Sequence, residues 1–246
     1  MTTIGYHRLF SLLALILAAS VFVGCSDDDD PCCPPLPNSG IVGTWVGYQG
    51  LMNGSPEPDG GSYGEAGSTM TLRNDYTGTM WDISTPNEIF EFTWSVDQGV
   101  VTAVSQEFGT QTASYTLNDD DLAITVVESD GTYTSLYRRH VGPSVLHASW
   151  QLISALDDYQ GIDLGVDPHT LQFAANGQAT MAVAGQGPEV FAYTTDGIFV
   201  DYGNGPFEPY NRFVYTVVGN VLYLVVHVPG PDVWEDVLVI LKYQRM

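Results

Sequence analysis

The sequence predicts an all-β protein of two tandem antiparallel up-and-down meanders, each of about eight strands and each closing into a small barrel. Two observations carry this prediction. Short segments rich in Thr, Val, Tyr and Phe alternate with a period of two, and Gly, Asn, Asp or Pro recurs between them. In addition, residues 70–80 align without gaps on residues 171–181. About eight strands suffice to close a small barrel, and a flattened β-sandwich of the same strands is the alternative.

The repeat extends along both halves of the chain and defines two domains, 41–140 and 146–246, with 141–145 as the linker. Each copy has about 100 residues, which is an ordinary domain size. Further matches keep their order in the two copies, and they are Trp45 with Trp150, 92–94 with 191–193, 115–117 with 215–217, 122–124 with 222–224, and Tyr137 and Arg139 with Tyr243 and Arg245.

The alternation places eight strands in each copy. In the first copy we expect strands near 42–49, 68–73, 77–83, 89–96, 100–105, 111–117, 121–128 and 132–139. In the second copy we expect them near 147–155, 169–174, 178–184, 189–194, 197–202, 209–217, 221–228 and 235–244.

The N-terminal segment has the features of a secretion signal. His7 and Arg8 precede an apolar run, 9–23, which is shorter than the roughly 20 residues of a spanning helix. Residues 21–25, Val-Phe-Val-Gly-Cys, resemble the lipobox of bacterial lipoproteins. The resemblance implies a signal peptide over 1–24 and acylation of Cys25, which would hold the protein in a lipid bilayer. An uncleaved membrane anchor is the alternative.

An acidic and Pro-rich tether, 25–40, follows the signal. Residues 26–30, Ser-Asp-Asp-Asp-Asp, resemble the export tag of some Gram-negative surface lipoproteins. We therefore expect an exported protein that is anchored in the outer membrane. The acidic run is either a tag for exposure at the cell surface or only a solvated spacer. Cys32 and Cys33 lie in this tether, and no cysteine follows them. The folded part must therefore be stabilised by packing rather than by disulfides.

Charge and motif content exclude several function classes. The formal net charge of −22 leaves no basic footprint for nucleic acid. No phosphate-binding glycine loop or His-x-x-x-His pair occurs, so we expect neither an enzyme nor a cofactor. We also expect no metal site. Three groups contain potential ligands but lack the number or spacing of a metal site, namely Cys32 with Cys33, His140 with His147, and Asp157, Asp158, Asp163 and Asp167.

The first and last strands carry a family resemblance. Gly43-Thr44-Trp45 together with Arg138 and Arg139 resembles the lipocalin pattern, in which an Arg lies over a first-strand Trp and closes the base of the barrel. The second copy repeats the device with Trp150 and Arg245, but it has Ala148 where the first has Gly43. The chain is thus similar, over roughly 41–246, to bacterial lipocalin-like domains carried on lipoproteins.

The resemblance implies a loop over the open end of the barrel, and residues 47–67 are Gly-rich and contain Pro, Met and Tyr, which would suit a lid. An ordinary surface loop is the alternative. Our candidate ligand-binding residues come from this loop and from the inward-facing strand positions, and they are Tyr48, Met52, Tyr63, Met80 and Trp94.

The last hairpin of the second copy is apolar on both faces over 221–226 and 237–241. One face can enter the barrel, and the other needs a cover, for which the first domain is the nearest candidate and a homodimer or an envelope partner the alternative. We therefore expect the two domains to form one rigid body. The predicted function is the binding of a small apolar or aromatic ligand in one barrel. The alternative is a surface module with filled barrels that engages a protein or a glycan.

Overall fold

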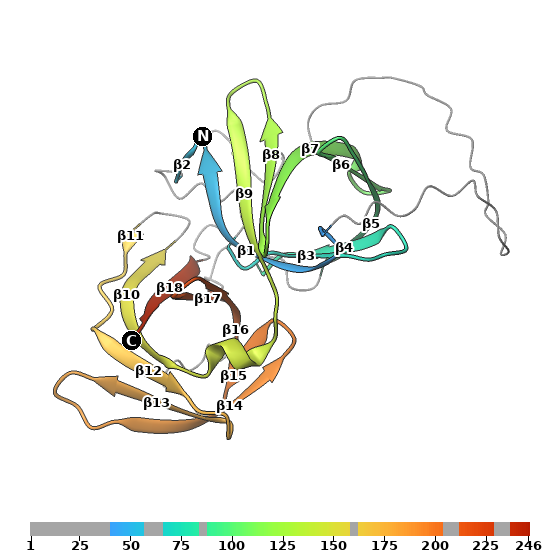
Figure 1. Ribbon diagram of the computed structural model, residues 1–246. Helices are drawn as coiled ribbons and strands as arrows, with labels where there is room; N and C mark the ends of the chain where they lie inside the picture. The colour runs from blue at the N-terminus through green and yellow to red at the C-terminus, as the bar shows by residue number, and fades with distance from the viewer. Residues whose placement is uncertain (1–39, 57–65, 84–87, 158–161, 204–211, 229–236) are drawn as a thin grey trace, which may run out of the picture.

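The computed structural model describes residues 40–56, 66–83, 88–157, 162–203, 212–228 and 237–246. Within these ranges the chain forms two separate rings of antiparallel strands, which lie beside each other in Figure 1. A short 3₁₀ helix, Pro143–Leu146, connects them. The predicted all-β fold of two tandem meanders is confirmed.

The first ring is a closed barrel. Its strands follow one another around the ring in chain order, and closure occurs where the first strand pairs with the last, from Trp45 opposite Arg139 to Met52 opposite Tyr133. A sandwich would leave this pairing open. The strands are β1 (Gly43–Met52), β2 (Ser55–Pro56), β3 (Thr69–Leu72), β4 (Thr77–Trp81), β5 (Ile89–Asp97), β6 (Val100–Ser105), β7 (Gly109–Asn118), β8 (Asp121–Val127) and β9 (Thr132–Arg139).

The second ring repeats this topology strand for strand. It closes between its first and last long strands, from Trp150 opposite Arg245 to Asp157 opposite Val239. The strands are β10 (Ser149–Asp157), β11 (Ile162–Asp163), β12 (His169–Phe173), β13 (Gln178–Val183), β14 (Glu189–Asp196), β15 (Phe199–Tyr202), β16 (Arg212–Val218), β17 (Val221–Val228) and β18 (Val237–Arg245). In each ring the two-residue strand, β2 or β11, is an addition to the eight expected strands.

The segment 47–67, expected as an irregular loop, begins instead as regular structure. β1 continues to Met52 and turns back into β2 through Asn53 and Gly54, with φ angles of 52° and 80°. Asn-Gly is the preferred pair for a two-residue hairpin with positive φ at both positions. Residues 57–65, which include Tyr63, lie outside the described residues, so the lid prediction is not tested.

Both barrels have a cap at the base made by a tryptophan and an arginine. Trp45 Nε1 donates to the Ile41 carbonyl at 2.7 Å, and the Arg139 guanidinium donates to the carbonyls of Val42 and Gly40 while pairing with Asp120. In the second barrel Trp150 Nε1 donates to the Leu146 carbonyl at 2.9 Å. Each indole is fully buried, so the cap satisfies its N–H at the closed end of the barrel.

An apolar cluster joins the two barrels from outside. Val225, Leu238 and Ile240 on the outer face of the last hairpin pack with Val46 and other residues of the first domain. β1 and β9 contact β16 along this seam, as Figure 1 shows. The remaining members of the cluster are Ala66, Ile83 and Val214. The expectation that the first domain covers the apolar outer face of the hairpin is confirmed for these residues.

Candidate functional site

The two barrels can be compared position by position, because their strands pair in the same register. Residues directly opposite each other in an antiparallel ladder share a face of the sheet. Trp94 pairs with Ala103 in the first barrel, and Tyr193 pairs with Tyr202 in the second. Trp94 and Tyr193 are buried in their respective cores, so Ala103 and Tyr202 occupy equivalent inward-facing positions.

The largest difference between the two interiors lies on β6 and β7. Tyr202 and Phe213 in the second barrel are each 1% exposed, and their ring centroids lie 5.4 Å apart. Val101 pairs with Ala113, whereas the equivalent Val200 pairs with Phe213. Two alanines of the first barrel therefore stand where the second has two packed aromatic rings.

Other inward positions differ in the same direction. Tyr137 pairs with Gly47, while its equivalent Tyr243 pairs with Leu152. Ser135, on the same strand as Tyr137, stands where the second barrel has Leu241. The burial of the inward side chains differs accordingly. Those of β6 and β7 are only partly buried, whereas those of β15 and β16 are nearly all buried. At these compared positions the first barrel carries less side-chain volume than the second.

Two of the predicted ligand-binding residues face this interior. Trp94 is buried in the first core, and Met80 packs against that core partly buried. Trp94 is also held from one side, because its Nε1 donates to the Thr77 carbonyl at 3.0 Å and the Tyr76 ring lies 5.8 Å away. Met52 lies at the opposite end of β1, partly exposed and paired with Tyr133, and it belongs to the rim rather than to the core.

Tyr48 does not join them. The pairing of β1 with β9 shifts between Gly47 and Gln49, and this bulge leaves Tyr48 as the extra residue. Its ring lies 5.5 Å from that of Tyr223, on the outer face of the second barrel. Burial there raises the pKa of the Tyr48 hydroxyl, with smaller contributions from Asp121 and Tyr223. Tyr48 is therefore part of the contact between the barrels.

The interior of the second barrel is closed by polar as well as apolar packing. His169 Nε2 and the Tyr243 hydroxyl lie 2.9 Å apart, and His169 Nδ1 lies 2.9 Å from the Asp167 carbonyl oxygen. Burial raises the pKa of the Tyr215 hydroxyl to about 12 and raises that of Tyr202 well above its usual value. The phenols are neutral. The Tyr202 ring lies where the first barrel has Ala103, whereas Tyr215 is matched by Tyr115.

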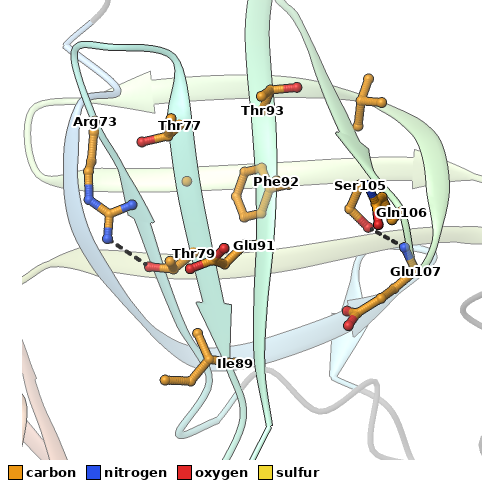
Figure 2. A pocket seen from close by; sticks show the side chains of 12 residues that line it. Arg73, Thr77, Thr79, Ile89, Glu91, Phe92, Thr93, Ser105, Gln106 and Glu107 are labelled. Carbon is orange, nitrogen blue, oxygen red and sulfur yellow. Dashed lines mark hydrogen bonds between the residues drawn. The ribbon is translucent and has the colours of Figure 1, made fainter.

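A hollow lies in the wall of the first barrel. It has a volume of about 690 Å³ and is lined mostly by outward-facing residues of β4, β5 and β6, together with Gly78 and Phe92, which face the core, and the β6–β7 turn lies at one end (Figure 2). Its lining residues are Arg73, Thr77, Gly78, Thr79, Ile89, Glu91, Phe92, Thr93, Val104, Ser105, Gln106 and Glu107.

The strand pairing explains this hollow. β5 pairs with β4 from Ile89 to Thr93, but it pairs with β6 only from Thr93 onward. Beyond the pair formed by Thr93 and Val104, β5 and β6 therefore separate, and the outer wall opens into a wedge. This hollow was not predicted from the sequence. A signal was present, however, because Arg73, Glu91 and Thr93 depart in chemical type from their second-copy equivalents Ala174, Val190 and Ala192.

Neither the acidic loop nor the histidines form a metal site in the part of the chain that the structure describes, where no group of three or more potential ligands occurs. Asp157 is buried at the end of β10, and Asp163 is exposed and accepts a hydrogen bond from the Gly165 N–H. Asp158 lies outside the described residues. Within the same ranges, no helix is long and apolar enough to cross a membrane.

The fold and the site together define a class of protein with two tandem, closed antiparallel β-barrels, each with a core that contains aromatic side chains. The first barrel has alanine at two inward positions where the second has Tyr202 and Phe213. No protein-family model and no curated protein matches the chain. The assignment of function must therefore rest on the residues themselves.

Proposed function

We propose that this chain is a non-catalytic, lipid-anchored envelope lipoprotein that binds a small apolar or aromatic ligand inside its first barrel. The observation that carries the proposal is the pair Ala103 and Ala113, which stand where Tyr202 and Phe213 fill the second barrel. Folded proteins rarely leave apolar space empty at a site where a repeat of the same chain fills it. An apolar guest would restore the missing contacts.

The lining supports an apolar guest with an aromatic part. Trp94 and Phe92 belong to the first core, and Met80, Tyr115 and Ile124 pack against it partly buried. A thioether and several rings provide adaptable apolar contact, and ring edges and faces favour an aromatic partner. The second barrel acts as a rigid support, because its core is full and its outer face packs on the first domain.

The test uses a neutral apolar fluorophore, N-phenyl-1-naphthylamine, titrated against the purified chain. We expect saturable binding to the wild type and a loss of affinity of at least about tenfold in the double variant Ala103→Tyr/Ala113→Phe, which transfers the side chains of the second barrel into the first. The matched control is Thr102→Tyr/Thr112→Phe, which adds the same rings on the outer face of the same two strands. Equal binding to the wild type and to a folded Ala103→Tyr/Ala113→Phe variant would reject the proposal.

The anchoring part of the proposal rests on the sequence around Cys25. Replacing Cys25 by Ser removes the acylation site, and we expect the variant to leave the membrane fraction and to lose incorporation of labelled palmitate. Deleting the four aspartates at 27–30 tests separately whether the protein is exposed at the cell surface. The wild type is expected to be degraded by a protease added to intact cells, and the deletion variant is expected to be protected. Protection of both proteins would place the chain on the inner face of the outer membrane.

A further inference from the structure

The outer-wall hollow of the first barrel holds a set of polar groups that the interior site does not use. Thr77 and Thr93 are directly paired across β4 and β5, and Thr79 is paired with Glu91 one step along the same face. Arg73 reaches this face from the preceding turn, and its Nη2 donates to Thr79 Oγ1 at 3.4 Å. Together with Glu107 these side chains form a polar row, with Arg73 at one end and Glu107 at the other (Figure 2).

The two turns that bound the hollow are fixed by their own hydrogen bonds. Ser105 Oγ accepts from the backbone N–H groups of Glu107 and Phe108, both at 3.1 Å. At the other end Asp75 Oδ1 accepts from the N–H and the hydroxyl of Thr77, at 3.0 and 2.6 Å. Because both turns are held before any ligand arrives, the polar groups they carry are preorganised, which lowers the entropic cost of binding.

The chemistry of the row specifies what it can hold. Threonine hydroxyls both donate and accept, the Arg73 guanidinium only donates, and the carboxylates of Glu91 and Glu107 only accept. A partner for all of them must itself donate and accept at several closely spaced points, as a row of hydroxyl groups does. Ile89 is 63% exposed and Val104 is 43% exposed on the same wall, so the partner also needs apolar C–H surface.

The charge of the hollow excludes further classes of ligand. The hollow has two carboxylates against one guanidinium, and the whole chain carries a net charge of −22. Such a surface repels phosphates, nucleic acids and acidic polysaccharides. The hollow of about 690 Å³ lies in the size range of small-molecule sites. A neutral sugar has the hydroxyl groups, the C–H faces and the absence of charge that this wall requires.

The second barrel supplies an internal comparison. At the positions of Arg73, Glu91 and Thr93 its outer wall has Ala174, Val190 and Ala192, and its Thr180 pairs with Val190 as Thr79 pairs with Glu91. The same wall therefore forms without the guanidinium, the carboxylate and the third hydroxyl, although Gln178 and Thr180 keep two of the positions polar. The wall does not need these three groups in order to form, which leaves ligand binding as a role for them.

We propose that the outer wall of the first barrel, centred on Arg73, Glu91 and Thr93, binds a neutral saccharide of about two to three sugar rings. This site opens on the outer side of the barrel wall and shares only Phe92 with the first core, so its polar groups are distinct from the lining proposed for the interior ligand. A chain with both sites would hold a glycan on its outer wall and an apolar molecule within.

The experiment begins with an array of neutral glycans probed with the full chain purified in detergent, followed by titration of each bound trisaccharide in solution. We expect at least one neutral saccharide to bind and the triple variant Arg73→Ala/Glu91→Val/Thr93→Ala to lose at least about tenfold in affinity. The variant carries the side chains of the second barrel, so it is expected to fold. Thermal unfolding and binding of N-phenyl-1-naphthylamine serve as checks that the barrel and its interior are intact.

The single variant Glu91→Gln keeps the size and the hydrogen-bonding reach of the side chain, and it is expected to weaken saccharide binding less than the triple variant does. Three results would overturn the proposal. They are the absence of any neutral glycan bound by the folded wild type, equal saccharide affinity of the wild type and the triple variant, and binding confined to charged glycans or to peptides.

Discussion

The guanidinium carbon of Arg139 lies 4.2 Å from the centroid of the Trp45 ring, whereas the equivalent Arg245 lies 5.6 Å from the centroid of Trp150. The difference has a local cause. Gly43 has a φ of 146°, and a Cβ at that position would lie 2.5 Å from Arg139 Nη1. The second barrel has Ala148 at the equivalent place. The glycine therefore allows the closer approach of the cation to the ring.

Gly43→Ala is expected to displace Arg139 from Trp45 and to lower the free energy of unfolding by about 1–3 kcal/mol, because the added methyl group overlaps the guanidinium and the backbone φ is unfavourable for alanine. Chemical denaturation measures the change. The control is Gly187→Ala, which meets nothing within 4 Å and is expected to change the stability by less than about 0.5 kcal/mol. Equal stabilities of the Gly43→Ala variant and the wild type would contradict this account of the cap.

Val225→Asp tests the joint between the barrels. Val225 is 2% exposed within the apolar cluster between the domains, so a carboxylate there has no partner and should lower the stability by more than about 2 kcal/mol. We expect the small-angle scattering profile to change from that of one rigid body to that of two domains that move independently. Val127→Asp, at an exposed position on the first barrel, should leave the profile unchanged. A compact Val225→Asp variant would argue against the joint.

The junction should also respond to pH. Burial lowers the pKa of His140 below its ordinary 6.5, and its ring packs edge-on against Tyr215 at 5.6 Å. The folded protein therefore favours neutral His140, and the unfolded chain binds more protons once the pH falls below about 6.5. The unfolding free energy should therefore decrease as the pH falls from about 6.5 to the pKa of His140 in the folded protein. Above about pH 6.5 it should not depend on this group.

Urea unfolding of His140→Gln between about pH 8 and about pH 5 checks this dependence. The variant should show a smaller decrease of stability with acidification than the wild type. His147→Gln, at an exposed position near His140, is the control variant. Identical pH profiles for the wild type and His140→Gln would remove His140 from the explanation.

Phe213→Ala tests the packing of the second barrel. The ring is 1% exposed and contacts Tyr202, so its removal should lower the unfolding free energy by about 3–5 kcal/mol. In the first barrel the equivalent residue is already alanine, and Ala113→Gly should cost only about 1 kcal/mol. Comparable losses from the two substitutions would show that the interiors are packed alike.

Much of the fold could be predicted from the sequence, because the evidence was periodic and present twice. Alternation located the strands, and the match of Trp45 and Arg139 to Trp150 and Arg245 located the closing strands of both barrels. The apolar outer face of the last hairpin correctly indicated a contact with the first domain. Each of these features depends on side chains of a recognisable type at a fixed spacing.

The site was harder to predict because it depends on register and curvature. Tyr48 was chosen as a residue of the expected loop, but β1 continues through it, and alternation from the buried Trp45 then puts Tyr48 on the same outer face as Val46. The outer hollow exists because β5 and β6 separate beyond Thr93, which is a property of the pairing. The contrast of Ala103 and Ala113 with Tyr202 and Phe213 becomes informative only when the ladders align the two interiors.

The most direct test of the central proposal is extraction of the purified full chain with organic solvent and identification of what is released by mass spectrometry. The account predicts an apolar or aromatic molecule in a ratio of about one per chain, present with the wild type and strongly reduced with Ala103→Tyr/Ala113→Phe. Release of nothing from the folded wild type, or of the same amount from both proteins, would contradict a ligand-binding first barrel.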